Sequence, residues 1–144
     1  MPNRTLRQVI EGQTVVSAPA STTVRAAAIT MSEHRIGAIL VVDGEGQLTG
    51  LFTERDVLNR VVAKGLDPDT TPLSAVMTSA LQTATPDKPL AHALHMMFEG
   101  GFRHVPVVEN GKPVGMVSAR NALGLEICQF EKELKDRDHI AEIL

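Results

Sequence analysis

The chain contains one long internal repeat. Residues 15–58 align with residues 81–123, with a single residue missing from the second copy. The most similar stretches are GLFTERD at 50–56 and GMVSARN at 115–121, which share a glycine, two apolar residues, a hydroxyl residue and an arginine. Two copies of a unit this long indicate two similar halves packed together, not an open array. A half of this size buries little core alone, so pairing is physically reasonable.

Each half is expected to have the order β-α-β-β-α, which places the chain in the α/β (α+β) class. A short first strand is predicted near 15–17 and near 81–83, followed by a turn and a helix. The apolar stripes that predict these helices are Val24, Ala28 and Met31 in the first copy, and Leu90, Leu94, Met97 and Phe98 in the second. The continuous apolar runs IGAILVV and HVPVV then read as buried strands.

A turn after each buried strand returns the chain into another strand. Asn110-Gly111 is a strong hairpin signal in the second copy. A second helix is predicted to begin at Thr53 and end at Gly65, a typical helix C-terminus, and its counterpart to begin at Ser118.

The flanking segments complete the predicted organisation. Thr5 is expected to cap a short N-terminal helix, residues 66–72 to form a linker, and PLSAVM at 72–77 to form one helical turn. After Leu125 the apolar spacing of Leu123, Ile127, Phe130 and Leu134 predicts a further helix that needs a partner surface. We therefore divide the chain into 1–66 (N-terminal helix and first motif), 67–77 (linker and entry helix), 78–126 (second motif) and 127–144 (C-terminal helical extension).

Composition narrows the function classes. The chain has no Trp or Tyr and a net charge of −3, which argues against stacking on bases or binding a phosphate backbone. Its one cysteine excludes an internal disulfide and a multi-cysteine zinc site. We find no segment of membrane-spanning length and expect a cytoplasmic protein.

The motif Thr53-Glu-Arg-Asp56 has two compatible interpretations. A threonine followed three residues later by an acid resembles a capping box, which satisfies the first N–H groups of a helix. A carboxylate at Asp56 is also suited to accept two hydrogen bonds from a ribose diol. The second copy has Asn121, which carries no charge, so either that site holds ribose less well or Asn121 is only a cap.

These motifs resemble the CBS domain, the module first named from cystathionine β-synthase. The resemblance covers about Val15 to Leu123 and is most specific in GAILVVDGEGQLTGLFTERDVL and FRHVPVVENGKPVGMVSARNAL. It implies two CBS motifs packed as a pseudo-twofold pair, a homodimer of such pairs, and a cleft that binds adenosine-containing ligands. The family's ligands include AMP, ADP, ATP, NAD and S-adenosylmethionine. The length of the chain suggests a stand-alone CBS-pair protein that regulates an unknown partner.

The resemblance and the residue chemistry together assign candidate binding residues. For ribose these are Thr53, Asp56, Ser118 and Asn121. For phosphate they are Arg35, Arg55, Arg103, His104 and Arg120, with Arg60 a weaker candidate. For adenine they are Val15, Val16, Ile36, Ala38, Leu81 and Val105. The change from Asp56 to Asn121 predicts the better ribose site in the first copy.

No catalytic or metal site is predicted. His92 and His95 are three residues apart on a helix, but no third ligand is evident. No nucleophile with an adjacent base can be assembled. We therefore expect a non-catalytic sensor of adenine nucleotides. The alternatives are a structural dimer module with vestigial pockets and, less in keeping with the charge, a nucleic-acid-associated regulator.

Overall fold

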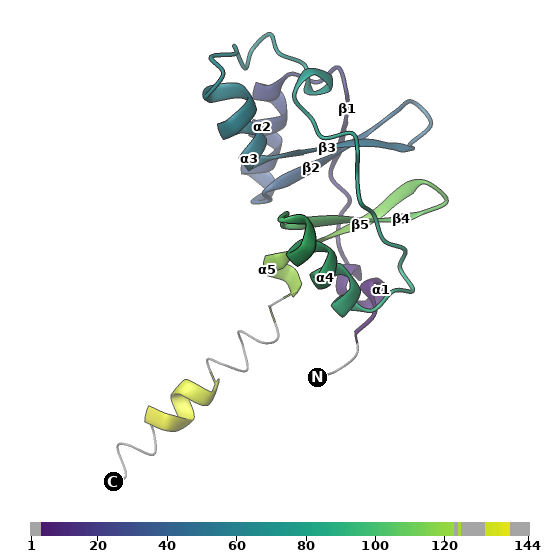
Figure 1. The fold of residues 1–144 in the computed structure, drawn as a ribbon, viewed down its shortest axis with the longest axis vertical. Helices are drawn as coiled ribbons and strands as arrows, with labels where there is room; N and C mark the ends of the chain where they lie inside the picture. The colour runs from purple at the N-terminus through teal and green to yellow at the C-terminus, as the bar shows by residue number, and fades with distance from the viewer. Residues whose placement is uncertain (1–3, 123, 125–131, 139–144) are drawn as a thin grey trace.

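The computed structural model describes residues 4–122, 124 and 132–138, and it contains two similar halves (Figure 1). The first half has the predicted order: β1 (Ser17–Pro19), α2 (Val24–His34), β2 (Ala38–Val42), β3 (Leu48–Thr53) and α3 (Glu54–Asp56), which continues as a π-helical segment, Val57–Val62. The second half has α4 (Leu90–Gly100), β4 (His104–Glu109), β5 (Lys112–Ser118) and α5 (Ala119–Ala122). Two short helical segments lead into the halves, α1 (Leu6–Ile10) and a 3-10 turn at Leu73–Ala75.

The first strand of each half differs from the prediction. β1 begins two residues later than expected and pairs in parallel with β2. The predicted strand at 81–83 is wrong: the described chain there makes only a single bridge, from Ala84 to Val107. The N–H of Leu81 instead donates to the carbonyl of Ser79 (3.0 Å), so this N–H is bonded within a local turn and not to a strand. The sheets therefore have the orders β1-β2-β3 and β4-β5.

The strand registers show that the hairpins of the two halves are equivalent. In the first hairpin Ala38 lies opposite Thr53, and in the second His104 lies opposite Ser118. Each hydroxyl residue thus stands at the open end of its hairpin, where the following helix begins. At the other end the tips of the two hairpins approach each other, and Leu48 N–H donates to the Gly111 carbonyl (3.0 Å) (Figure 1).

Local turn chemistry follows the sequence closely. Asn110 and Gly111 both have positive φ, 55° and 77°, which confirms the tight hairpin turn. Gly65 lies in the turn after the π-helical segment with φ 69°, and its N–H donates to the Val62 carbonyl (3.1 Å), so the helix ends close to the predicted glycine. Thr5 and Gln8 form a reciprocal capping box at the start of α1, so the predicted N-terminal helix is confirmed.

The two short helical segments pack on opposite halves from those they precede in the sequence. The segment α1 comes before the first half but packs on the second, and the turn at Leu73–Ala75 comes before the second half but packs on the first. Leu6 of α1 is fully buried in the core of the second half, beside Leu90 and Val105. Leu73, which leads into the second half, is fully buried in the core of the first half, beside Val24. The division into segments made above stays a prediction, but the apolar cores cross its boundaries.

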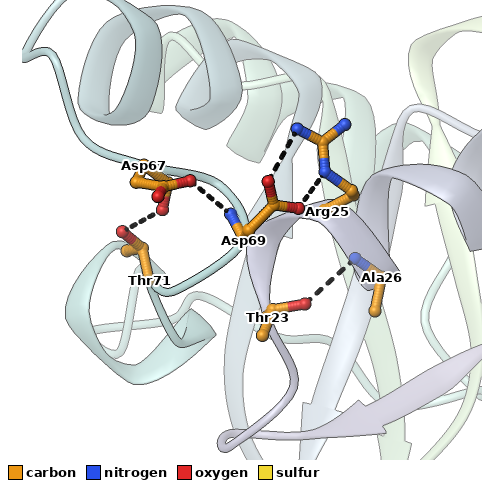
Figure 2. Close-up of polar contacts among 6 residues, drawn as sticks. All are labelled: Thr23, Arg25, Ala26, Asp67, Asp69 and Thr71. Atoms are coloured by element: carbon orange, nitrogen blue, oxygen red, sulfur yellow. Dashed lines mark hydrogen bonds and ion pairs between the residues drawn. The ribbon is translucent and has the colours of Figure 1, made fainter.

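The linker is fastened to the start of α2 (Figure 2). Asp69 forms an ion pair with Arg25, and its own N–H donates to the side chain of Asp67 (2.9 Å). Thr23 caps α2 by accepting from a backbone N–H three residues on (3.2 Å). These contacts hold residues 66–72 where they deliver Leu73 to the first core.

The buried faces of the long helices differ from the predicted stripes at one position in α2 and at two positions in α4. The buried residues are Val24, Ala27 and Met31 in α2, and Leu90, Ala93 and Met97 in α4. Phe98 is 87% exposed, so its assignment to the core face was wrong. It follows Met97 by one residue, about 100° further around the helix, which turns it toward solvent. Leu123, Ile127 and Phe130 of the predicted C-terminal stripe lie outside the described residues; Leu134 lies on a described helical segment, 132–138.

Candidate functional site

A cleft of about 1080 Å³ lies between the two halves, at the open ends of the hairpins. The first half lines it with residues 13–16, 31–32, 34–38, 40 and 54. The second half lines it with residues 103–104, 115–116 and 118–120. Its volume suits a nucleotide-sized ligand. Because both halves supply walls, a bound ligand would touch both.

Nine of the residues assigned from the sequence line this cleft. They are Val15, Val16, Arg35, Ile36, Ala38, Arg103, His104, Ser118 and Arg120. The side chain of Asn121 lies outside what the structure describes, although its backbone belongs to α5. The cleft thus brings the hydroxyl residue of the second motif together with the entry segment of the first half. Whether these side chains hold a ligand stays a prediction.

Thr53 and Asp56 do not line the cleft but cap α3. The Thr53 N–H donates to Asp56 Oδ2 (3.0 Å), and the Asp56 N–H donates to Thr53 Oγ1 (3.2 Å). Asp56 is 7% exposed and pairs with Arg60 Nε at 3.4 Å. The capping-box interpretation is therefore confirmed. A ribose at Asp56 would have to share or displace these partners.

The other three assigned residues also lie away from the cleft lining. Arg55 donates to the carbonyl of Gly101 (3.2 Å). Val105 is fully buried in the core of the second half. Leu81 packs against the buried cluster of Ala38, Leu40 and Leu51. The weaker candidate, Arg60, donates to the carbonyls of Val76 and Met77 (3.2 and 3.1 Å).

Local backbone geometry positions the basic residues. Arg35 ends α2 in the left-handed conformation (φ 55°), and the next N–H, of Ile36, donates back to Met31 (3.0 Å). Arg103 immediately precedes β4, and its carbonyl accepts from the N–H of Ala119 (2.9 Å), which ties it to the start of α5. The cleft thereby gathers three guanidinium groups from separate elements on a chain of net charge −3.

His104 and Glu54 line the same cleft as these arginines. His104 is half-buried at the start of β4, and burial lowers the pKa of its imidazole. The nearby Arg103 lowers that pKa further, whereas Glu54 opposes the shift. A histidine with a lowered pKa is neutral near pH 7 and gains a charge only on acidification or when an anion binds.

The wall at residues 13–16 contains a contact that the sequence did not reveal. Gln13 Nε2 donates to the Met116 carbonyl (3.0 Å), and Gln13 Oε1 accepts from the Met116 N–H (3.1 Å). The side-chain amide of Gln13 thus bonds both backbone polar groups of Met116 in β5, as a neighbouring strand would. Beside this contact, Gly115 lets Ile10 of α1 pack close to β5, since a Cβ at Gly115 would lie 2.7 Å from the Cβ of Ile10. No sequence signal marks Gln13, because its partner is 103 residues away.

Comparison with known proteins identifies the family. The sequence profile of the CBS domain matches residues 7–63 and 73–126. The chain belongs to the CBS domain family. A CBS domain-containing protein of Arabidopsis thaliana, CBSCBSPB3, is 38% identical over 123 residues, which is 85% of this chain. This chain spans only about a fifth of that relative's length, 22%.

Solved CBS structures share the fold. A putative signal-transduction protein with CBS domains from Burkholderia ambifaria MC40-6 superposes with a TM-score of 0.80 at 29% identity, covering 86% of this chain and 94% of the other. A CBS domain protein from Pyrobaculum aerophilum, solved in complex with AMP, gives a TM-score of 0.76 at 28% identity, covering 87% and 98%. The resemblance recognised in the sequence and the pairing of two CBS motifs are thus confirmed.

The described part of the chain shows neither a metal-binding cluster nor a membrane-spanning helix. No group of three or more His, Cys, Asp or Glu side chains there is arranged to hold a metal ion. None of the helices in those residues is long and apolar enough to cross a bilayer.

Proposed function

We propose that this CBS pair is a non-catalytic regulatory module that binds an adenosine-containing ligand in the cleft between its motifs. The observation that carries the proposal is the composite cleft itself, which joins apolar strand residues of the first half to Ser118 and three arginines. The AMP complex of the Pyrobaculum relative supports the ligand class. AMP, ADP, ATP and NAD share the adenosine part that such a cleft would recognise.

Each wall of the cleft has a proposed role. Val15, Val16 and Ile36 provide an apolar surface for the adenine ring. Ser118 offers a hydroxyl to the ribose. Arg35, Arg103 and Arg120 place positive charge where a phosphate group would lie, and guanidinium groups suit phosphate oxygens. A ligand bridging both halves would shift the conformational equilibrium by its differential affinity for the two arrangements.

A homodimer is proposed as the state that a partner protein reads. Ile29 on α2, and Leu58 and Val62 on the following π-helical segment, are exposed apolar residues. Ile29 and Val62 line a groove that also includes Val57 and Val61. Burying such a face against a second copy removes apolar area from water. Analytical ultracentrifugation of Val62→Glu should give monomers, and an unchanged mass would contradict this dimer surface.

Thermal unfolding with added ligand tests the binding proposal. A ligand at one hundred times its dissociation constant should stabilise the native state by about 2.7 kcal/mol. AMP, ADP, ATP, NAD and S-adenosylmethionine would be compared with adenosine alone. Arg35→Gln should reduce the shift, whereas Arg137→Gln, which removes an exposed arginine outside the cleft, should not. Absence of a shift with every ligand would favour the structural-module alternative.

A further inference from the structure

Glu54 places a carboxylate inside a cleft that is otherwise basic. It is the first residue of α3, and its N–H donates to the carbonyl of Gly37 (2.9 Å). A Cβ added to Gly37 would lie 3.1 Å from Glu54 Oε1 and 3.5 Å from His104 Cε1. The carboxylate of the first half and the imidazole of the second therefore border the same point of the cleft. Among the described residues, Glu54 forms no salt bridge.

The acid is absent from the equivalent place in the second motif. Thr53 corresponds to Ser118, so Glu54 corresponds to Ala119, whose N–H makes the equivalent bond to the Arg103 carbonyl. Gly37 in turn corresponds to Arg103. At these two positions the first motif therefore has an acid, Glu54, that the second lacks, and the second has a base, Arg103, that the first lacks. Capping does not explain the acid, because Thr53 and Asp56 already form the reciprocal cap.

The positive charge that lines the cleft nearly balances the negative charge of one phosphate group. Three arginines and one glutamate give a formal charge of +2 when the lining histidines are neutral. A phosphate monoester carries about −1.5 to −2 near pH 7. Every further phosphate would add negative charge in a cleft that also contains the Glu54 carboxylate.

We propose that Glu54 is a specificity-determining residue that makes the cleft favour adenosine ligands with one phosphate over those with two or three. This inference rests on the proposed nucleotide-binding function and assigns the charge class of its ligand. For unit charges about 8 Å apart and an effective dielectric constant of about 60, repulsion weakens binding roughly threefold for each added charge. The two additional charges of ATP thus correspond to about tenfold.

Isothermal titration calorimetry with AMP, ADP and ATP tests the inference. The full chain, Glu54→Gln and the control Glu45→Gln, which makes the same charge change in an exposed hairpin loop, would be compared. We expect wild type to bind AMP more tightly than ATP. Glu54→Gln should improve ATP binding about tenfold more than AMP binding, and the control should leave the ratio unchanged. The difference should shrink at high salt, because exposed charges are screened.

A second variant leaves α3 unchanged, so its effect on nucleotide binding cannot come from a disturbance of that helix. Ala119→Glu places an acid at the equivalent position of the second motif and should weaken ATP binding more than AMP binding. Equal changes for AMP and ATP in both variants would overturn the role of Glu54 while leaving nucleotide binding intact. Failure of wild type to bind any of the three nucleotides would overturn the proposed function and this inference together.

Discussion

Replacing Asp56 with alanine separates the two interpretations of the first motif. In the structure Asp56 Oδ2 accepts the Thr53 N–H at 3.0 Å, and Oδ1 lies 3.4 Å from Arg60 Nε. Alanine would remove both contacts and leave a partly buried N–H without its acceptor. A hydrogen bond to a charged group contributes about 1.5–3 kcal/mol, and a helical ion pair at this spacing about 0.3–0.5 kcal/mol. We expect Asp56→Ala to lower the free energy of unfolding by about 2 kcal/mol.

Urea unfolding followed by circular dichroism measures this loss directly. Asp56→Asn is the matched variant, because it retains an acceptor for the Thr53 N–H and removes only the charge, so it should lose about half as much. For a chain of this size 2 kcal/mol corresponds to a decrease in melting temperature of about 4–8 °C.

The same variants then measure the thermal shift on adding AMP. If Asp56 acts only as a cap, the AMP-induced shift in Asp56→Ala should equal that of wild type, measured from the lower starting temperature. If Asp56 also binds the ribose, as the sequence predicts, Asp56→Ala should lose most of the AMP-induced shift. A melting temperature within one degree of wild type would refute the reasoning about the cap itself.

Three further predictions follow from the core and the cleft. Leu6→Ala, at the fully buried residue of α1, should cost about 3 kcal/mol in urea unfolding, close to Leu73→Ala; a loss below about 1 kcal/mol would show that α1 is peripheral. Gly115→Ala should cost about 1–3 kcal/mol, since its Cβ would meet Ile10 at 2.7–2.9 Å, and trimming Ile10 to alanine in the same chain should recover part of that loss. The third concerns pH. Burial lowers the pKa of His104 below its ordinary 6.5, so as pH falls below about 6.5 the unfolded chain takes up this proton first and stability decreases. His104→Gln should flatten that part of the stability profile between pH 7.5 and 5.5, and an unchanged slope would contradict the assignment.

Short-range features of the structure could be predicted from the sequence. The capping residues Thr5 and Thr53, the Asn110-Gly111 turn and the helix end at Gly65 all depend on neighbours a few residues away. Their conformations follow from side chains bonding nearby N–H groups, or from residues that tolerate positive φ. The repeat likewise implied two similar halves, because similar local patterns fold into similar elements.

The exact exposed face of a helix could not be predicted so well. The apolar stripe on α4 includes both Met97 and Phe98, and periodicity alone does not choose between adjacent apolar residues. Packing against the second core selected Met97 and left Phe98 in solvent. The strand predicted at 81–83 failed for a related reason, since a strand exists only where a partner accepts its hydrogen bonds.

For this protein, the sequence alone determined the family, the repeated elements and the helix caps. Only the tertiary structure decided that Leu6 packs in the core of the second half and Leu73 in the core of the first. It also decided that the Gln13 side chain bonds to β5, and that Ser118 lines the cleft whereas Asp56 caps α3. Caps and turns are satisfied within a few residues, so their signals are local. A cleft forms from surfaces that are distant in the chain, and which side chains meet there depends on how the two cores pack.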